Sequence, residues 1–502
     1  MEGQGKQATQ GRQGRGKGKG KVDERFFDGF EAINLDAAGI DVGSQTHYVS
    51  VPDDRDEKPV RSFGCYTADL LTMAAWLKQC KIRTVVMEST GVYWIPVYRV
   101  LEDAGFDVQL VDARHAKSVP GRKTDVWDSR WLRRLHTFGL LRGCFIPARD
   151  IQTVRTYWRH RLGLVESASQ QIHLMQKSLE QMNVQLHKVI SDITGVTGTI
   201  IIRAIVAGER DPEALASLEH PKVKRSKEEI IKALTGHYSE EHLFTLQQAL
   251  ETYDFCHQQM VACDAKVQAY MAQFEDKQKD EEEESAGEDA ANTKKSGQHS
   301  RRKNEPHFDL RGELFRITGI DLPKAHGIQA MTAQVVYTEL GYDVSDFPTV
   351  KHFCSWLCVC PNNRTTGGRI RSRRTRRTQN RLANALRVAV QSLHSSDCAL
   401  GAFYRKIKAK RGPAVATTAT AHKLARIIYH MLKHGEAFVE QGQAEREAKY
   451  REQQIKRLQK NATKLGFTLV NQETGEMAGA PVPIAMHLDP ASLVAAQPVL
   501  AA

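Results

Sequence analysis

The sequence predicts an α/β domain near the N-terminus, followed by regions that are largely α-helical. Between Asp36 and Ile146, short apolar runs bounded by turn residues alternate with segments of helical periodicity. That pattern is typical of a sheet covered by helices. From residue 150 to 274, apolar residues recur every three or four positions, as on one face of long helices. Residues 351–440 combine helical spacing with a dense run of arginines.

The elements of the α/β domain can be placed along the chain. Strands are expected at Ile40–Val51, Val60–Cys65, Thr84–Met87 and Asp107–Val111. The third of these is a continuous apolar run, as in strands buried within a parallel sheet. Helices are expected at Ala68–Cys80 and Tyr93–Ala104, with another starting at Asp125. Elements in this order predict an RNase H-like fold.

The rest of the chain divides by composition. A long helical stretch without proline, and a second one after it, resemble the arms of a coiled coil; a plain helical bundle within one subunit is the alternative. Blocks of like charge without aromatic residues do not pack, so such segments are expected to be disordered. The expected regions are a disordered basic tail (1–35), the α/β domain (36–149), a helical coiled-coil region (150–274), a disordered charged insertion (275–306), a second helical domain (307–440), and a charged helix with a disordered tail (441–502).

Charge and cysteine content limit the function classes. The formal net charge of +12 favours a polyanionic partner, although other basic soluble proteins share this property. The nine cysteines are scattered and follow no secretory signal, which predicts a reducing cytoplasm. No apolar run approaches the roughly 20 residues needed to cross a bilayer. We therefore expect a cytoplasmic protein with a nucleic-acid partner and no membrane contact.

Four acidic residues are candidates for a metal site. Asp41 and Glu88 lie on predicted strands, whereas Asp125 and Asp128 are one helical turn apart at the start of a predicted helix. Taken singly, each is more often a surface residue, and Asp125 would also serve as a helix cap. Together, two acids on neighbouring strands and two on one helix face can converge on paired Mg²⁺ ions. Metals held in this way cut or join phosphodiesters.

A dense basic segment follows a flexible turn near residue 367. Thr366, Gly367 and Gly368 precede the run of arginines, and glycines allow backbone to approach a ligand closely. Arginine binds phosphate through two parallel hydrogen bonds. A solvated, disordered stretch is the alternative, but an apolar helix follows at once. The expected nucleic-acid-binding residues are Arg122, Lys123, Arg364, Arg369, Arg371, Arg373, Arg374, Arg376 and Arg377.

Other metal and catalytic motifs are weak. His352, Cys354, Cys358 and Cys360 lie close together, but their spacing matches no common zinc site. Their segment instead has the pattern of an apolar helix, in which cysteine is a small core residue. No phosphate-binding glycine loop of the GxxxxGK[ST] type occurs in the chain.

Three stretches together resemble a known family. They are Gly39–Val51, Val85–Leu132 and Cys360–Arg369, and the most specific piece is Pro-Gly-Arg-Lys-Thr-Asp-x-x-Asp at residues 120–128. They are similar to the DEDD-type insertion-sequence transposases of the family written IS one-ten, which are bridge-RNA-guided DNA recombinases. The resemblance runs from about Ala37 to Val439, interrupted by the acidic insertion.

The resemblance implies a RuvC-like N-terminal domain whose four acids match Asp41, Glu88, Asp125 and Asp128. It also implies a coiled coil that mediates assembly into a dimer or tetramer, and a helical transposase domain with a nucleophilic serine before a Gly-Gly pair. Here that position is Thr366, whose Cβ methyl crowds the hydroxyl. Three possibilities follow: Thr366 is the nucleophile, Ser372 or Ser355 replaces it, or the copy is impaired. We favour the first.

The resemblance thus implies a transposase that cuts and rejoins donor and target DNA, guided by a bridge RNA, with two Mg²⁺ ions and a covalent 5′-phosphoprotein intermediate. It would act in the bacterial cytoplasm, at the nucleoid. One rival interpretation is a RuvC-like endonuclease that cuts branched DNA with metal-activated water and does not need Thr366. Another is a non-catalytic nucleic-acid-binding protein, in which Asp41 and the other acids have no chemical role.

Overall fold

The computed structural model describes residues 27, 29–89, 91–112, 125–218, 225–277 and 304–470. Within them, the side chains of Asp125 and of residues 436–447 are not described. The chain forms two compact units, residues 1–146 and residues 147–502, and each is considered by itself. Most of the predicted N-terminal tail, most of the charged insertion and residues 471–502 lie outside the described residues. The described end of that tail is ordered rather than disordered: Phe27 is buried against Phe138, and the backbone N–H of Ile33 donates to the carbonyl oxygen of Thr137 at 2.8 Å. Of the helices described, none is both long and apolar enough to span a membrane.

Unit 1 is built on a mixed five-stranded sheet of order β3-β2-β1-β4-β5. Strands β1 and β2 and strands β2 and β3 pair antiparallel, whereas β1, β4 and β5 run parallel. This sheet with its helices is consistent with the RNase H-like expectation. The strands are β1 (Ala37–Val42), β2 (Thr46–Ser50), β3 (Val60–Gly64), β4 (Thr84–Glu88) and β5 (Asp107–Val111).

The prediction of a single strand at Ile40–Val51 was wrong, because this segment is a hairpin. Residues 43–45 turn the chain between β1 and β2, and Ile40 pairs with Val49. A Cβ on Gly43 would lie 2.4 Å from the carbonyl oxygen of Thr46, so the turn is too tight for a side chain at that position. In the sequence the turn is marked only by Gly43, Ser44 and Gln45, between apolar residues on either side.

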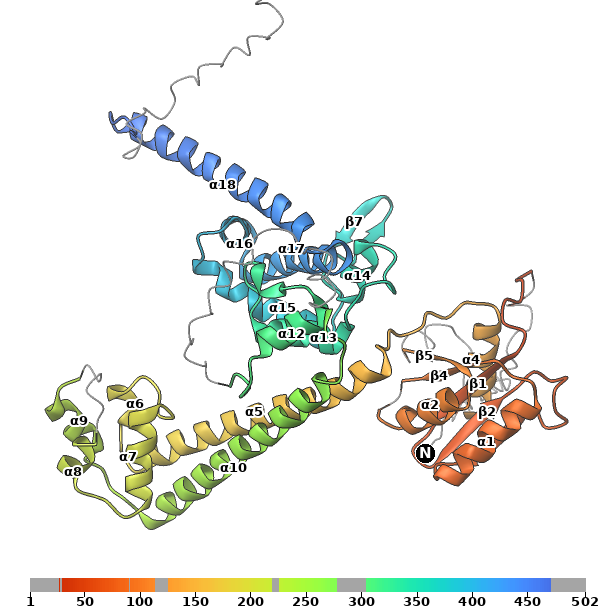
Figure 1. Ribbon diagram of the computed structural model, residues 1–502, viewed down its shortest axis with the longest axis horizontal. Coiled ribbons are helices and arrows are strands. Elements are labelled where there is room, and N and C mark those ends of the chain that lie inside the picture. Colours follow the sequence, from red (N-terminus) through yellow and green to blue (C-terminus); the bar gives the residue numbers. More distant parts are fainter. Residues whose placement is uncertain are drawn as a thin grey trace, which may run out of the picture. The chain divides into compact units, whose positions relative to one another are not determined.

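Helices cover both faces of the sheet (Figure 1). Strand residues alternate between faces, so Ile40 and Met87 join the core with α1 (Thr67–Gln79) and α2 (Trp94–Asp103). Val86 packs on the opposite face with Leu132 and Leu135 of α4 (Asp125–Thr137). The helix that carries two of the candidate acids therefore packs directly on the central strands.

Unit 2 begins with a pair of long helices, α5 (Arg149–Gln181) and α10 (Glu240–Met271), which pack along each other. They run antiparallel, because Ser178 near the end of α5 bonds Thr245 near the start of α10, and Arg161 pairs with Asp264 farther along. Four short helices between them close a separate apolar core. These are α6 (Leu186–Val189), α7 (Val196–Val206), α8 (Pro212–Ala216) and α9 (Lys227–Leu234).

The remainder of unit 2 is a helical bundle around α17 (Pro413–His434), with a small hairpin of strands. Helix α17 packs against the helices on either side of it in sequence and against others, and it buries side chains along its whole length. The other elements are α12 (Leu310–Thr318), η2 (Leu322–Lys324), α13 (Ala330–Leu340), α14 (Val350–Trp356), β6 (Arg364–Thr366), β7 (Arg369–Ser372), α15 (Arg381–Ser392), η3 (Leu393–Ser395), α16 (Ala399–Arg411) and α18 (Glu436–Lys464).

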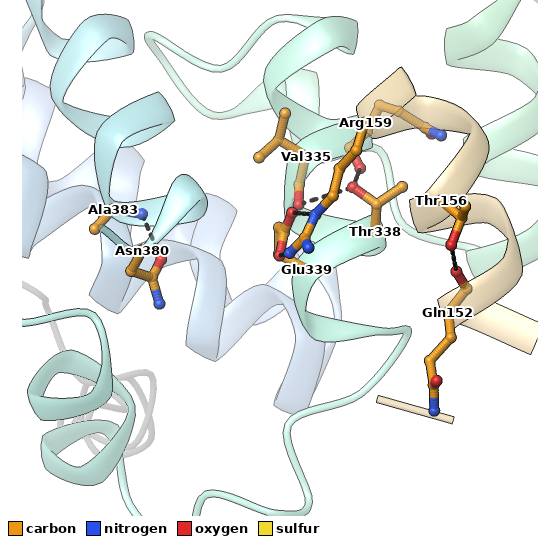
Figure 2. Close-up of polar contacts among 9 residues, drawn as sticks. Gln152, Thr156, Arg159, Val335, Thr338, Glu339, Asn380 and Ala383 are labelled. Carbon is orange, nitrogen blue, oxygen red and sulfur yellow. Dashed lines mark hydrogen bonds and ion pairs between the residues drawn. The ribbon is translucent and has the colours of Figure 1, made fainter. Parts of the chain in front are cut away.

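Polar contacts tie the long helix α5 to this bundle (Figure 2). Arg159 donates from Nε and Nη2 to the two carboxylate oxygens of Glu339 on α13, at 2.9 and 2.5 Å. Such a two-bond pair fixes the relative rotation of the helices as well as their distance. Asn380 caps α15 by accepting from the backbone N–H of Ala383 at 2.9 Å, which fixes the start of this helix at Arg381.

Candidate active site

Asp41 and Glu88 lie next to each other on parallel strands. The register of β1 and β4 pairs Ile40 with Met87, and each acid is the residue that follows. Paired residues on neighbouring strands are about 4.8 Å apart, and both acids point to the face opposite Ile40. Glu88 is buried, with 9% of its surface exposed, whereas Asp41 is half-buried. The sheet therefore brings these two predicted acids together at the carboxyl ends of its central strands, where ligands of α/β sheets gather.

Helix α4 runs antiparallel to these strands. At its C-terminal end, the ring Nε2 of His136 lies 2.8 Å from the Thr84 hydroxyl at the start of β4. At its middle, Gly39 of β1 contacts its backbone: a Cβ on the glycine would lie 2.3 Å from the Ser129 carbonyl oxygen. The first turns of α4 are consequently directed toward the strand ends that carry Asp41 and Glu88.

Asp128 precedes Ser129 on α4 and is 9% exposed. It is thus the third predicted acid at this end of the sheet. Asp125 is the first residue of α4, but its side chain is not described, and Arg122 and Lys123 lie outside the described residues. Carboxylate oxygens are the donors that Mg²⁺ prefers, so the donor chemistry fits. Within the described side chains, however, no group of three His, Cys, Asp or Glu residues is arranged to hold a metal ion.

Thr366 lies at the end of β6, immediately before a two-residue turn. It pairs with Arg369 on β7, and the turn residues Gly367 and Gly368 have φ of +54° and +74°. Positive φ at both central positions is the mark of a type I′ turn, which suits the twist of a two-stranded hairpin. We call residues 364–372 the arginine hairpin. Residues 351–440 were expected to be helical, but the arginine hairpin within them is formed by two strands. Its residues are mostly polar, so they do not provide the apolar face that a packed helix needs.

The arginine hairpin and the chain that follows it present a strongly basic surface. In the described part of the chain, the predicted arginines of this region are exposed and none forms an ion pair with a carboxylate. Arg376 instead donates to the carbonyl and the hydroxyl of Ser355 at 2.6 and 3.1 Å, which fixes the segment to α14. The predicted residues brought together here are Arg364, Arg369, Arg371, Arg373, Arg374, Arg376 and Arg377.

The hydroxyls of the three candidate nucleophiles, Thr366, Ser372 and Ser355, have different surroundings. Ser355 accepts a hydrogen bond from Arg376, and Ser372 accepts one from the backbone N–H of Arg374 at 3.3 Å. The exposed Thr366 hydroxyl has no hydrogen-bond partner among the described residues. Thr366 is therefore the one of the three whose oxygen is not engaged within the described structure.

The cysteines next to α14 do not form a metal centre among the described residues. Burial raises the pKa of Cys354 to about 12, so its thiol stays protonated near neutral pH, whereas metal ligation requires the thiolate. Phe353 and Cys354 are buried on α14, in agreement with the interpretation of this segment as a core helix.

Comparison with known proteins identifies the family. Residues 38–184 match the model of the DEDD transposases of IS110 elements, described as a transposase. Residues 322–405 match the model described as transposase of the IS116/IS110/IS902 family. The chain belongs to the IS110 family of DEDD transposases. It is thus a phosphoryl-transfer enzyme of DNA transposition. No curated protein matches the chain.

The two matched regions divide the candidate site of the transposase. The first includes Asp41, Glu88, Asp125 and Asp128, and the second includes Thr366 with the arginine hairpin. The family implies use of a divalent metal ion. The resemblance predicted from sequence is confirmed at this level.

Sequence reasoning missed the residues that set the position of α4. Gly39 leaves room for the helix backbone, and the His136–Thr84 contact fixes the other end of the helix. Gly39, two residues before Asp41, was the available signal, since glycine inside a strand often marks a close approach of another backbone.

Proposed function

We propose that this transposase cuts and rejoins donor and target DNA under the guidance of a bridge RNA, with Thr366 as the nucleophile. The main support is the position of Thr366: its hydroxyl is exposed and unengaged within the described structure, at the end of a tight turn flanked by arginines without carboxylate partners. Such arginines would hold the phosphates on either side of a scissile bond.

The acids Asp41, Glu88, Asp125 and Asp128 would hold two Mg²⁺ ions. Their shared end of the sheet supports this assignment, and so does the family match. When bound, the ions would polarise the scissile phosphate and stabilise the leaving 3′ oxygen. The burial of Glu88 and Asp128 would limit access of water to this place and strengthen the interaction of each carboxylate with a cation.

The covalent step follows from the chemistry of a threonine hydroxyl. The Thr366 Oγ1 attacks the phosphorus and loses its proton, the bond from phosphorus to the 3′ oxygen breaks, and that oxygen takes up a proton. The DNA 5′ phosphate is then esterified to Thr366. A 3′ hydroxyl of the partner strand attacks the same phosphorus, forms the new phosphodiester and restores the threonine hydroxyl. No external energy source is needed, because one ester replaces another.

Assembly would bring the two parts of the site together. The acids lie in unit 1 and Thr366 lies in unit 2, so we propose that a dimer or tetramer of this chain completes the site. Exposed apolar residues on α5 and α10, including Leu174, Phe244 and Phe255, support a coiled coil between subunits. Guide RNA and both DNAs would be held mainly through phosphates, while base pairing selects sequence.

The test is detection of the protein–DNA adduct. The protein is incubated with its element-derived RNA, Mg²⁺ and end-labelled DNA, and the adduct is located by mass spectrometry. We expect a phosphothreonine linkage at residue 366. Thr366→Ser should keep the adduct, and Thr366→Ala should abolish it. Thr365→Ala is the matched control, because Thr365 is an adjacent, equally exposed threonine on the same strand.

The rival outcomes are separable. Cleavage that persists in Thr366→Ala but is lost in Asp41→Asn would favour hydrolysis by a RuvC-like nuclease. DNA binding without products in the wild type, unchanged by Asp41→Asn, would favour a non-catalytic protein. Omission of the RNA should abolish site-specific products if the guide selects the target.

A further inference from the structure

Helices α16, α17 and α18 line an open pocket of about 690 Å³, and Thr366 is not among its lining residues. Its volume is within the roughly 300–1,000 Å³ typical of small-ligand sites. One face of α16 provides small residues, Ala399, Ala402 and Ala409, which leave the space open. Residues of α18 four positions apart, Lys449 and Gln453, form the opposite wall. We call this the α16–α18 pocket.

The pocket is strongly basic. Five of the described residues that line it are Lys or Arg, and none is Asp or Glu. These are Arg405, Lys406, Lys423, Lys449 and Arg457. Arg405 also lies 3.9 Å from the carboxylate of Asp397, which does not line the pocket. The excess of cations among the lining residues concentrates a positive potential inside the pocket, which favours an anionic ligand.

Two of these cations are fixed by neighbouring groups. The ammonium group of Lys423 lies 3.7 Å from the centre of the Phe403 ring. Arg405 donates to the carbonyl oxygens of His394 and Ser396, at 3.0 and 2.7 Å. Ordering of these side chains before a ligand arrives lowers the entropy cost of binding. The pocket is thus partly organised without a ligand.

Flat and amide-bearing side chains line the same space. Phe403 and Tyr450 are aromatic, and Gln453 and Gln454 carry amides that both donate and accept hydrogen bonds. A phosphate needs only the cations. An aromatic base can stack on the rings and bond to the amides through its edge. The combination therefore matches a nucleotide better than it matches a free phosphate or a carboxylate.

We propose that the α16–α18 pocket binds one nucleotide of a single-stranded nucleic acid, with its base against Tyr450 and its phosphate among the cations. A base within a duplex has both faces covered by its stacked neighbours, so only an unpaired nucleotide of RNA or of DNA can place its base on the ring. This site is separate from the arginine hairpin and does not depend on the assignment of Thr366 as the nucleophile.

Photocrosslinking of the full-length protein tests the proposal. The probes are a single-stranded RNA with 4-thiouridine, a single-stranded DNA with 4-thiothymidine, and the same strands paired with their complements. We expect a crosslink at Tyr450 with a single strand, and at least about fivefold less with the duplex. The RNA and DNA arms show which strand supplies the nucleotide. No crosslink in this pocket with either single strand would overturn the proposal.

Charge variants provide the second arm, measured by fluorescence anisotropy. The pocket variant is Lys406→Gln with Arg457→Gln. The control is Arg451→Gln with Lys460→Gln, which removes the same charge from exposed positions of α18 that do not line the pocket. We expect the pocket variant to bind the single strand about tenfold more weakly, and the slope of log affinity against log salt concentration to fall in magnitude by about 1 to 2. The affinity and the slope should both be unchanged in the control variant.

Two results would refute the proposal in this arm. Equal weakening in both variants would mean that the effect is general electrostatics. Displacement of the single strand by a poly-glutamate peptide at equal charge concentration would mean that the pocket accepts acidic segments of proteins. Tyr450→Ala should weaken single-strand binding about tenfold and Tyr450→Phe should not, since stacking needs the ring alone.

Discussion

Gly39 of β1 lies against Ser129 of α4 so closely that a Cβ on the glycine would be 2.3 Å from the serine carbonyl oxygen. The same added atom would lie 2.4 Å from the backbone nitrogen of Arg133. Both neighbours are backbone atoms of a packed helix, which cannot turn aside as a side chain can. The helix that carries Asp125 and Asp128 is therefore positioned against the strand that carries Asp41.

We expect Gly39→Ala to displace α4 and impair catalysis. Overpacking of this kind costs about 1–3 kcal/mol, and the shift would separate Asp128 from the strand acids. DNA cleavage should fall at least about tenfold, while circular dichroism still shows a folded chain. Gly163→Ala is the control, because that helical position has open space for a Cβ. Normal cleavage by Gly39→Ala would contradict this account of the site.

The turn after Thr366 should tolerate only residues that accept a positive φ. An added Cβ at Gly367 meets nothing within 4 Å, so any penalty comes from backbone conformation. Gly367→Val should cost about 1–2 kcal/mol in local strain and strongly reduce adduct formation. Gly367→Asn should retain most of the adduct formation, because asparagine adopts the left-handed backbone conformation more easily than valine does. Equal adduct yields for the two variants would exclude the turn as a requirement.

The buried pair Arg161–Asp264 should stabilise the α5–α10 helix pair. Both side chains are 1% exposed, and Asp264 also accepts from the backbone N–H of His307 at 3.1 Å. Asp264→Asn leaves the arginine charge buried without a counter-charge, at a cost of about 3–5 kcal/mol. Asp254→Asn breaks the exposed pair with Arg203 and should cost about 0–1 kcal/mol. The stabilities of the two variants are compared by urea denaturation, followed by circular dichroism. Similar denaturation midpoints for Asp264→Asn and Asp254→Asn would refute the prediction.

Unit 1 should lose stability in mild acid. Burial lowers the pKa of His136 and the pKa of His47 below the ordinary 6.5. The folded state therefore holds both rings neutral, while the unfolded chain binds protons below that value. The stability from the neutral rings is present above pH 6.5 and is lost as pH falls through the lower folded pKa. Melting temperatures from about pH 7.5 to about pH 5 should fall less for His136→Gln than for the exposed control His352→Gln.

The sequence predicted the strands and helices of unit 1 wherever apolar periodicity was continuous. Thr84–Met87 and Asp107–Val111 agree with β4 and β5 within a residue, because buried parallel strands have an unmistakable apolar pattern. The turn at residues 43–45 and the arginine hairpin were missed. In both, the signal was a glycine-containing turn rather than a change in hydrophobicity, and the Gly-Gly pair at 367–368 is typical of a type I′ turn.

The positions of the strand acids could be predicted from sequence, but the position of α4 could not. Asp41 and Glu88 were expected to be neighbours because their strands are adjacent in an RNase H-like sheet. The direction of α4 was not predictable, because it depends on contacts such as Gly39 with Ser129. The α16–α18 pocket was also beyond sequence reasoning, since residues from His326 to Arg457 meet there and share no periodicity.

The arginine hairpin contributes almost no buried apolar surface, for residues 361–370 are all exposed. Loss of the Thr366 hydroxyl should therefore leave the protein folded, abundant and still attached to nucleic acid. With Thr366 as the proposed nucleophile and a dimer or tetramer as the proposed assembly, copies of the element that have lost this hydroxyl would produce inactive subunits that enter mixed assemblies with active ones. Inactive copies in a genome would then lower the rate at which the active copies of the same element transpose.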